Sequence, residues 1–286
     1  MTKLTLDTEI NLAVVMGYPI THSRSPLMHN TLMKENDVRG VYIPIEIKPG
    51  TLGPALESLP KLGFKGVNLT MPLKQEAIAT VDELDPVGKL MGAVSCIVVR
   101  RDNSLLGVNN DWIGFRDNLH ATFPGWKSTT QSALVLGAGG GGLAIVYALI
   151  QEGVKEIVIT NRSQERAEKV AAIFKDQNIL VRPWSDRHSL VEESDLIVNT
   201  TNQGMAGQTP LDLSLELAKP DTIVADIIYV PLETTLITDA KSRGLRTVGG
   251  LGMLLHQSRP AWKLWFGIDP AITKNLWAVM EADIVT

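Results

Sequence analysis

The stretch LVLGAGGGGLAIVYALIQEG, residues 134–153, decides the fold because it has the pattern of a strand, a glycine turn and a helix in that order. Gly137, Gly139 and Gly142 have the spacing G-x-G-x-x-G. Glycines so spaced let the backbone approach a pyrophosphate, and the following helix offers its free N–H groups to that charge. The stretch predicts a Rossmann-type unit whose phosphate loop also contains Ala138 and Gly140.

Other interpretations of this loop stay open. A tight strand-to-helix turn without any ligand needs the same glycines, and a methyltransferase loop is a minor rival. A Walker loop is disfavoured because no Lys-Ser/Thr pair follows the glycines.

The end of the next strand, ITNRSQER at residues 159–166, bears on the choice of cofactor. NAD-selective sites place an Asp or Glu there for the ribose 2′-hydroxyl, whereas this chain has Asn161, Arg162 and Ser163. Arg166 follows one helical turn later, and two guanidinium groups can grip a 2′-phosphate. The segment therefore predicts NADP, and the alternative is that both arginines are ordinary solvated surface.

Outside this stretch, β-rich apolar runs alternate with helical patterns over most of the 286 residues. The pattern predicts two α/β domains: a catalytic, substrate-binding domain at 1–110, completed by 250–286, and a Rossmann-type NADP-binding domain at 111–249. The C-terminal helical pattern is expected to return to the first domain. We also expect Ser25 to cap the helix that starts there, and a helix to follow Lys74.

Composition excludes several classes of protein. The net charge is −4 with both signs mixed along the chain, so we expect no nucleic-acid partner. No apolar run reaches about 18 residues, and the first 17 residues do not resemble a secretory signal, so we expect a cytoplasmic chain without a membrane span. The lone Cys96 excludes an internal disulfide, and the five histidines lack metal-ligand spacing, so no metal is expected.

Polar side chains gather where the predicted strands of the first half end. Hydroxyls and amides suit a small polyhydroxylated carboxylate, and a lysine with an aspartate can form a proton-transfer pair. The ordinary alternatives are helix caps and solvated surface. The residues are Ser23, Ser25, Asn68, Thr70, Lys74, Ser95, Asn109, Asn110 and Asp111.

With these residues in view, the chain resembles the shikimate dehydrogenase family. GYPITHSRSP resembles its signature G-x-P-I-x-H-S-x-S-P, GVNLTMPLK resembles G-x-N-V-T-x-P-x-K, and GVNNDWIGF resembles G-D-N-T-D-G-x-G. The later motifs GAGGGG, NRSQERA, NTTNQGM and GLGMLLHQ match in the same order. The resemblance covers nearly the whole chain.

The resemblance implies reversible, NADP-dependent reduction of 3-dehydroshikimate to shikimate. It implies Lys74 and Asp111 as the catalytic pair, facing each other in a crevice between the domains. For the substrate it implies Ser23, Ser25, Asn68, Thr70, Ser95, Tyr229 and Gln257. For NADP it implies Gly137, Ala138, Gly139, Gly140, Gly142, Asn161, Arg162, Ser163, Arg166, Thr200, Gly250 and Met253.

Departures from the family pattern cluster in the substrate half. Ser95 and Cys96 stand where the family usually has Asn-Thr, and Asn110 and Trp112 stand where Thr and Gly are usual. Val108 and Gly249 each replace a usual Asp. The shorter Ser95 leaves space, and Trp112 adds bulk near the hinge. A shifted substrate and tolerated drift explain these changes equally well.

Three functions therefore remain to be weighed. The first is a shikimate dehydrogenase of aromatic amino acid biosynthesis that acts on a cyclic hydroxy acid. The second is a quinate or aminoshikimate-type dehydrogenase, and the third is a non-catalytic dinucleotide-binding regulator. The sequence leaves a homodimer open.

Overall fold

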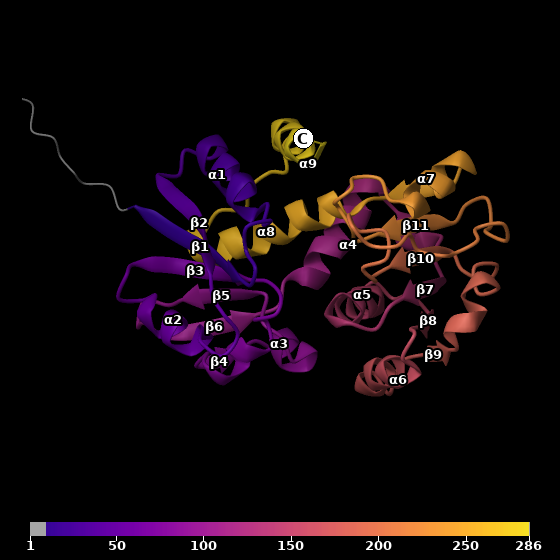
Figure 1. Cartoon of the computed structure of the whole chain (residues 1–286), viewed down its shortest axis with the longest axis horizontal. Coiled ribbons are helices and arrows are strands. Elements are labelled where there is room, and N and C mark those ends of the chain that lie inside the picture. The colour runs from indigo at the N-terminus through magenta and orange to yellow at the C-terminus, as the bar shows by residue number, and fades with distance from the viewer. Residues whose placement is uncertain (1–9, 286) are drawn as a thin grey trace, which may run out of the picture. The chain divides into compact units, whose positions relative to one another are not determined.

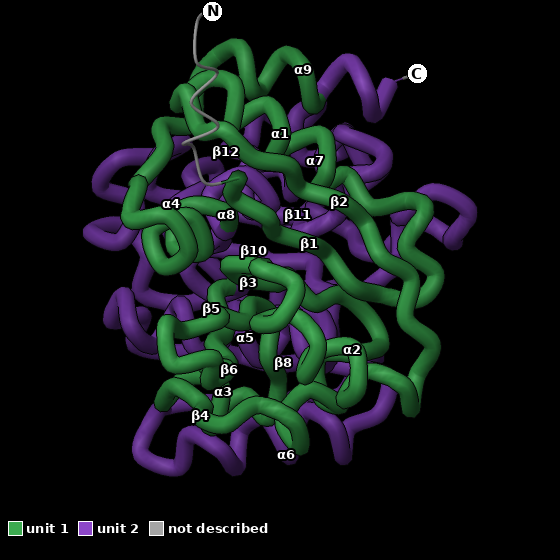
Figure 2. Tube along the Cα trace, turned by 90° about the vertical axis from the view of Figure 1, so that its left-hand side faces the viewer, with its two compact units in different colours: residues 1–110, 258–280 green, residues 111–257, 281–286 purple. Residues whose placement is uncertain are grey.

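The structure is a computed structural model that describes residues 10–285. The chain divides into two compact units, coloured separately in Figure 2. Unit 1 comprises the chain up to residue 110 and residues 258–280, and unit 2 comprises residues 111–257 and the end of the chain from 281. Over the described range, no helix has the length and apolarity that a membrane span needs. Residues 1–9, which belong to the segment expected not to be a secretory signal, lie outside the described residues.

Unit 1 is built on a mixed six-stranded sheet in the order β2-β1-β3-β5-β6-β4 (Figure 1). β1 runs parallel to β2 and β3, and β5 runs antiparallel to β3 and β6. The strands are β1 Asn11–Gly17, β2 Gly40–Glu46, β3 Phe64–Leu69, β4 Glu83–Leu84, β5 Cys96–Val99 and β6 Leu105–Val108. The helices are α1 Ser25–Glu35, α2 Leu52–Ser58, the 3₁₀ helix η1 Glu76–Ala79, and α3 Pro86–Met91.

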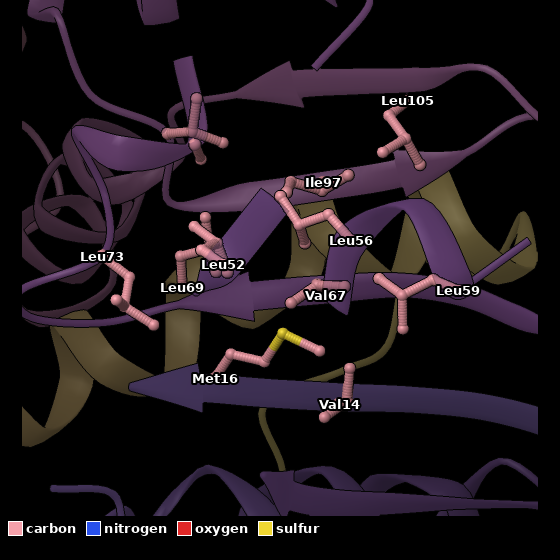
Figure 3. Packing of buried hydrophobic residues seen from close by; sticks show 12 residues of the cluster. Val14, Met16, Leu52, Leu56, Leu59, Val67, Leu69, Leu73, Ile97 and Leu105 are labelled. Carbon is pink, nitrogen blue, oxygen red and sulfur yellow. The ribbon is translucent and has the colours of Figure 1, made fainter. Parts of the chain in front are cut away.

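The core of unit 1 lies between the sheet and α2 (Figure 3). Val14 on β1 and Val67 on β3 point to the same side as Leu52 and Leu56 of α2, and all four are fully buried. Burying each such side chain stabilises the fold by about 1.5–3 kcal/mol. This packing anchors β1 and β3, whose carboxyl ends carry the polar motifs.

Two local expectations about unit 1 are wrong. Ser25 is the first residue of α1 and Arg24 is its N-cap, while the Ser25 N–H donates to Ser23 Oγ at 3.4 Å. The segment after Lys74 forms only the 3₁₀ helix η1. The Val94 N–H binds the Lys74 carbonyl at 2.8 Å, so that carbonyl cannot start an α-helix.

Unit 2 is built on a six-stranded sheet in the order β12-β11-β10-β7-β8-β9, with every neighbouring pair parallel. From β9 to β12 this is the 3-2-1-4-5-6 order of the doubly wound Rossmann fold. The strands are β7 Ser132–Leu136, β8 Glu156–Thr160, β9 Ile179–Arg182, β10 Leu196–Asn199, β11 Ile223–Asp226 and β12 Arg246–Val248. The fold therefore confirms the predicted α/β class with a Rossmann-type unit.

The helices of unit 2 are α4 Asp111–Thr122, η2 Trp126–Ser128, α5 Gly140–Gln151, α6 Gln164–Ile173, η3 Trp184–His188 and α7 Thr235–Ser242. The last two helices of the chain are α8 Gly250–Phe266 and α9 Lys274–Val285. Residues 258–280, which include the second half of α8, belong to unit 1. The second half of α8 and the part of α9 up to residue 280 thus return to unit 1, while residues 250–257 and the end of α9 belong to unit 2.

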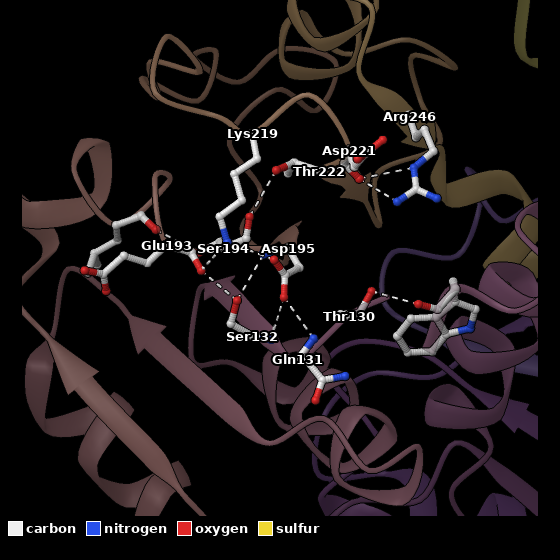
Figure 4. Close-up of polar contacts among 12 residues, drawn as sticks. Thr130, Gln131, Ser132, Glu193, Ser194, Asp195, Lys219, Asp221, Thr222 and Arg246 are labelled. Atoms are coloured by element: carbon white, nitrogen blue, oxygen red, sulfur yellow. Dashed lines mark hydrogen bonds and ion pairs between the residues drawn. The ribbon is translucent and has the colours of Figure 1, made fainter. Parts of the chain in front are cut away.

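The amino-terminal edge of the unit 2 sheet is held by Asp195 (Figure 4). Its carboxylate accepts the backbone N–H groups of Gln131 at 2.9 Å and Ser132 at 3.1 Å, and the Lys219 ammonium at 2.9 Å. These bonds join the starts of β7 and β10. In an open parallel sheet, ligands bind at the opposite, carboxyl edge.

Candidate active site

The glycine loop of unit 2 has the geometry of a phosphate cradle. Gly137 has φ +112°, and a Cβ added to Gly142 would lie 2.4 Å from the Gly137 carbonyl oxygen. Both positions therefore need glycine. A Cβ on Gly139 or Gly140 would meet nothing within 4 Å, so the backbone at the start of α5 borders open space. A pyrophosphate fits such an opening at a helix N-terminus.

Thr200 borders the same loop from the end of β10. Its hydroxyl donates to the Leu136 carbonyl oxygen at 2.9 Å, and a Cβ on Gly137 would lie 2.5 Å from Thr200 Oγ1. The two strands that flank the point where the strand order reverses therefore meet at this loop. Ligands of doubly wound sheets bind at that point.

The end of β8 presents a basic edge beside the glycine loop. Asn161 Oδ1 accepts the Ala138 N–H at 3.2 Å, and Asn161 Nδ2 donates to the Ser163 carbonyl oxygen at 2.8 Å. Arg162 and Arg166 are exposed, and neither side chain has a hydrogen bond or ion pair within residues 10–285. Open glycines and two available guanidinium groups, without a carboxylate at the strand end, fit NADP.

Gly250 and Met253, also predicted for the cofactor, lie in the first turn of α8. The Gly250 N–H donates to the Ile228 carbonyl oxygen at 3.2 Å, and a Cβ there would lie 2.3 Å from the Ile227 carbonyl oxygen. Gly250 is therefore required by close packing against the loop after β11. A contact of Met253 with the cofactor stays a prediction.

In unit 1, a chain of contacts connects most of the residues predicted for the substrate. Ser25 lies next to Tyr42, and the Tyr42 hydroxyl donates to Asn68 Oδ1 at 2.7 Å. Asn68 Nδ2 points to the Ser95 carbonyl oxygen at 3.4 Å. The structure thus brings together side chains from α1, β2, β3 and the start of β5.

Ser95 leads to Asn110, which the sequence placed among the polar groups at the strand ends without giving it a role toward the substrate. The Ser95 hydroxyl accepts the Asn110 backbone N–H at 2.8 Å, and both residues are about 95% buried, with 5% and 6% of their surfaces exposed. Within the described part of the chain, the Asn110 amide nitrogen has no hydrogen-bond partner. Buried donors without a partner are rare in folded proteins, so this amide is a candidate contact for a ligand acceptor. Its sequence signals were its place at a strand end and the departure from the Thr usual in the family.

Thr70 and Lys74 lie on the segment that leaves β3. The Thr70 N–H donates to the Met16 carbonyl oxygen at 3.0 Å, at the end of β1. The bond between the Lys74 carbonyl and Val94 fixes the lysine backbone next to Ser95. Both residues are half-buried.

The remaining predicted residues belong to unit 2. Asp111 is the first residue of α4, Tyr229 follows β11, and Gln257 lies in α8. The pairing of Asp111 with Lys74, and the approach of Tyr229 and Gln257 to the substrate, stay predictions.

Trp112 packs inside unit 2. Its ring meets Tyr147 edge-on at 5.1 Å and 86°, and the Arg116 guanidinium lies 4.8 Å from its ring centre. The aromatic and cation–π contacts account for a large side chain in the first turn of α4. Where the family usually has glycine, this chain gains a contact between α4 and α5.

The structure adds two observations on metal and thiol chemistry. Among the described residues, no group of His, Cys, Asp and Glu side chains is arranged to hold a metal ion. Cys96 is a buried thiol on β5.

The glycine loop and basic strand end of unit 2, with the hydroxyl and amide cluster of unit 1, define a dinucleotide-binding α/β protein of the dehydrogenase class. Family models described as "Shikimate dehydrogenase substrate binding domain" and "Shikimate / quinate 5-dehydrogenase" match residues 15–97 and 119–214. The chain belongs to the shikimate dehydrogenase family, and the resemblance found in its motifs is confirmed.

Relatives and solved structures cover nearly the whole chain. The NADP(+) shikimate dehydrogenase of Paramagnetospirillum magneticum is 43% identical over 96% of this chain and 99% of its own. Thermus thermophilus shikimate 5-dehydrogenase, solved with NADP(H) and shikimate, has a TM-score of 0.81 at 31% identity, covering 96% and 99% of the two chains. Corynebacterium glutamicum quinate dehydrogenase, solved with NAD, has a TM-score of 0.88 at 26% identity, covering 98% and 100%.

Proposed function

We propose that this chain is an NADP-dependent shikimate dehydrogenase that interconverts 3-dehydroshikimate and shikimate in aromatic amino acid biosynthesis. The observation that carries the proposal is the 43% identity to an NADP(+) shikimate dehydrogenase over 96% of this chain. The hydroxyl and amide cluster of unit 1 supports it, because a polyhydroxylated carboxylate needs such partners.

Unit 2 would hold the cofactor. Gly139 and Gly140 would offer backbone N–H groups and open space to the pyrophosphate, and Arg162 and Arg166 would grip the 2′-phosphate. NADPH, when bound, supplies the hydride for the ketone carbon. Asn161 would keep the loop in shape through its bond to Ala138.

Residues of unit 1, helped by Tyr229 and Asp111 of unit 2, would bind and protonate the substrate. Ser23 and Ser25 would hold its carboxylate, helped by Tyr229. In the reductive direction the Lys74 ammonium would donate a proton to the ketone oxygen, which becomes the alcohol, and Asp111 would orient the lysine. In the oxidative direction the same amine would take that proton back.

The proposal is tested with purified protein, shikimate and NADP, by following the absorbance of NADPH. We expect turnover by the wild type, and a loss of about 10²- to 10⁴-fold in kcat for Lys74→Ala with an unchanged Kd for NADP. Lys61→Ala, an exposed lysine after α2, is the matched control and should keep full activity. Near-wild-type kcat in Lys74→Ala would remove the lysine from the mechanism.

A second candidate is a quinate or aminoshikimate-type dehydrogenase. Ser95 favours it, because the shorter hydroxyl stands where the family usually has an amide. A panel of shikimate, quinate and an amino analogue, each with NADP and with NAD, separates the candidates by kcat/KM. Tight NADP binding without turnover of any compound would favour a non-catalytic regulator.

We also propose a cytoplasmic location, and we keep a homodimer as a testable arrangement. The single, buried Cys96 suits a reducing compartment. β2 is an edge strand on which Val41 and Ile43 are exposed, and such an edge can pair with a second copy. Light scattering on the purified chain measures the oligomeric state, and cell fractionation measures the location.

A further inference from the structure

A buried stack of aromatic side chains in unit 1 ends at Asn68, the amide predicted to contact the substrate. Trp262 on α8, His29 on α1 and Tyr42 on β2 are all at most 1% exposed. The Trp262 indole N–H donates to His29 Nδ1 at 2.8 Å. The rings of His29 and Tyr42 stack at 4.1 Å and 11°, and Tyr42 Oη donates to Asn68 Oδ1 at 2.7 Å. We call these four residues the Asn68 relay.

The protonation state of the relay follows from its burial and its bonds. Burial lowers the pKa of His29 to about 3, and burial raises the pKa of Tyr42 well above its usual value, so both side chains are neutral near pH 7. Since His29 Nδ1 accepts the indole N–H, the ring proton must sit on Nε2. The Nε2–H is then the only donor of the His29 ring, and Asn68 lies close enough to raise the pKa of His29, although burial outweighs that effect.

These bonds determine what Asn68 can offer a ligand. The amide oxygen accepts the Tyr42 hydroxyl at 2.7 Å, which fixes the orientation of the amide. The amide nitrogen has one long contact, 3.4 Å, to the Ser95 carbonyl oxygen, and it can donate a further hydrogen. With its oxygen held by Tyr42, Asn68 offers a ligand its N–H donor.

We propose that His29, Tyr42 and Trp262 are positioning residues that lock Asn68 as a hydrogen-bond donor, so that the site selects an oxygen substituent and rejects an ammonium at the adjacent ring position. This inference rests on the proposed function and narrows its substrate class to hydroxy acids. A hydroxyl or ketone oxygen accepts the Asn68 N–H. An ammonium has only donors, so its N–H groups would face the Asn68 N–H. This repulsion would disfavour an amino substituent at that position.

The test is a double-mutant cycle in kcat/KM for shikimate. Tyr42→Phe keeps the ring and its stacking but removes the bond to Asn68, and we expect a loss of about five- to tenfold. In an Asn68→Ala background the same substitution should cost nothing further, because Tyr42 acts through Asn68. Additive losses, or wild-type kcat/KM in Tyr42→Phe, overturn the inference.

Tyr147→Phe is the matched control, since Tyr147 packs on Trp112 in unit 2 and lies outside the relay. It should leave kcat/KM unchanged. Trp262→Phe is a second variant that removes the bond to His29 together with part of a buried ring, and it should move kcat/KM in the same direction as Tyr42→Phe. The melting temperature and the Kd for NADP show that each variant is folded.

The preference among substrates is a second measurement, because a purely structural role of Tyr42 would not change it. Each ring hydroxyl of shikimate is replaced in turn by an ammonium, and the preference for the hydroxyl is measured as a ratio of kcat/KM. We expect one position to be rejected by about a hundredfold or more in the wild type, and the ratio to fall in Tyr42→Phe. Equal losses for every analogue would contradict the inference, while absence of wild-type turnover would count against the proposed function alone.

Discussion

At the residue scale, Ser95 and Asn110 are two departures from the family pattern that contact each other in the structure. The Ser95 hydroxyl accepts the Asn110 backbone N–H at 2.8 Å, and its own O–H stays available as a donor. The Asn110 side chain brings an amide to the neighbouring position, and among the described residues its nitrogen has no partner. We predict that this amide takes the place of the one usual at residue 95.

This exchange predicts that Asn110 stabilises the complex at the expense of the free protein. A buried donor without a partner costs about 1–3 kcal/mol. Asn110→Ala should therefore leave the free energy of unfolding unchanged or raise it, while kcat/KM falls by about tenfold. Urea unfolding and steady-state kinetics measure the two quantities.

Asn109→Ala is the control for that prediction. Asn109 Nδ2 donates to the Ala93 carbonyl oxygen at 3.0 Å, so its removal should lower the free energy of unfolding by about 1 kcal/mol. If Asn110→Ala instead destabilised the fold as much and left kcat/KM intact, the role assigned to its amide would be wrong.

At the element scale, the connection from β8 to α6 is where cofactor preference should lie. Arg162 follows the strand and Arg166 is in the first turn of the helix, both exposed. We expect Arg162→Ala/Arg166→Ala to raise the Kd for NADP by about ten- to a hundredfold, because charge-assisted bonds to the 2′-phosphate are lost. The Kd for NAD, measured by the same titration, should change little.

Lys169→Ala is the matched cation for this test. It lies on the same helix and pairs with Glu165 at 2.7 Å, away from the strand end. Its Kd for NADP should equal that of the wild type. A double arginine variant that lost NAD and NADP affinity equally would show that the two side chains do not read the 2′-phosphate.

The end of β11 predicts a pH dependence of stability. Asp226 is 2% exposed and accepts bonds from Thr234 Oγ1 at 2.7 Å and the Ile228 N–H at 3.0 Å, which shape the loop that carries Tyr229. Burial raises its pKa to about 6, so the folded chain holds the proton more tightly than the unfolded chain. The stabilisation is complete below about pH 4 and is lost as the pH rises through about 6.

Asp226→Asn should remove this dependence. A pKa that differs by about 2 between the two states corresponds to about 3 kcal/mol. The unfolding free energy of the wild type relative to Asp226→Asn should therefore fall by about 3 kcal/mol between pH 4 and pH 7. Urea unfolding at each pH measures it, and a constant difference across that range would contradict the assignment.

Asp195 is an internal control, because its pKa is shifted in the opposite direction from that of Asp226. Burial pushes its pKa up, but the bonds from Lys219, Gln131 and Ser132 outweigh burial and lower it. Its stabilisation is therefore present at neutral pH and is lost as the pH falls through the folded pKa. The unfolding free energy of the wild type relative to Asp195→Asn should therefore rise with pH, whereas that relative to Asp226→Asn should fall.

At the scale of the whole molecule, regular patterns predicted most of the fold and tertiary contacts supplied the rest. The strand, glycine turn and helix of residues 134–153 form β7, the loop and α5 as predicted. β4 and β12 were missed because two and three residues are too few to show a period. The segment after Lys74 was misassigned because the competing bond comes from Val94, twenty residues later.

The candidate site was likewise predicted only in part from the sequence. Motifs located the glycine loop, but the Asn68 relay has no motif, because Trp262 and His29 are 233 positions apart and Tyr42 and Asn68 are 26 apart. Nothing in the spacing of these residues predicts that they touch. They meet because α1, β2, β3 and the end of α8 share unit 1.

The proposed sites, with NADP on the glycine loop of unit 2 and the substrate carboxylate on Ser23 of unit 1, predict that each ligand stabilises the chain mainly through its own unit. At a hundred times its Kd, NADP should stabilise the folded chain by about 2.7 kcal/mol, which corresponds to a rise of about 5–10 °C in melting temperature. Ser23→Ala, in unit 1, should keep this rise, and Arg162→Ala/Arg166→Ala should lose most of it at the same concentration. Shikimate at a hundred times its own Kd should give the reverse pattern, because its carboxylate would bind Ser23. Differential scanning fluorimetry of the wild type and both variants, each with either ligand, measures all six shifts. A Ser23→Ala chain that lost the NADP shift would show that the cofactor site depends on unit 1, and the separation of ligands by unit would then fail.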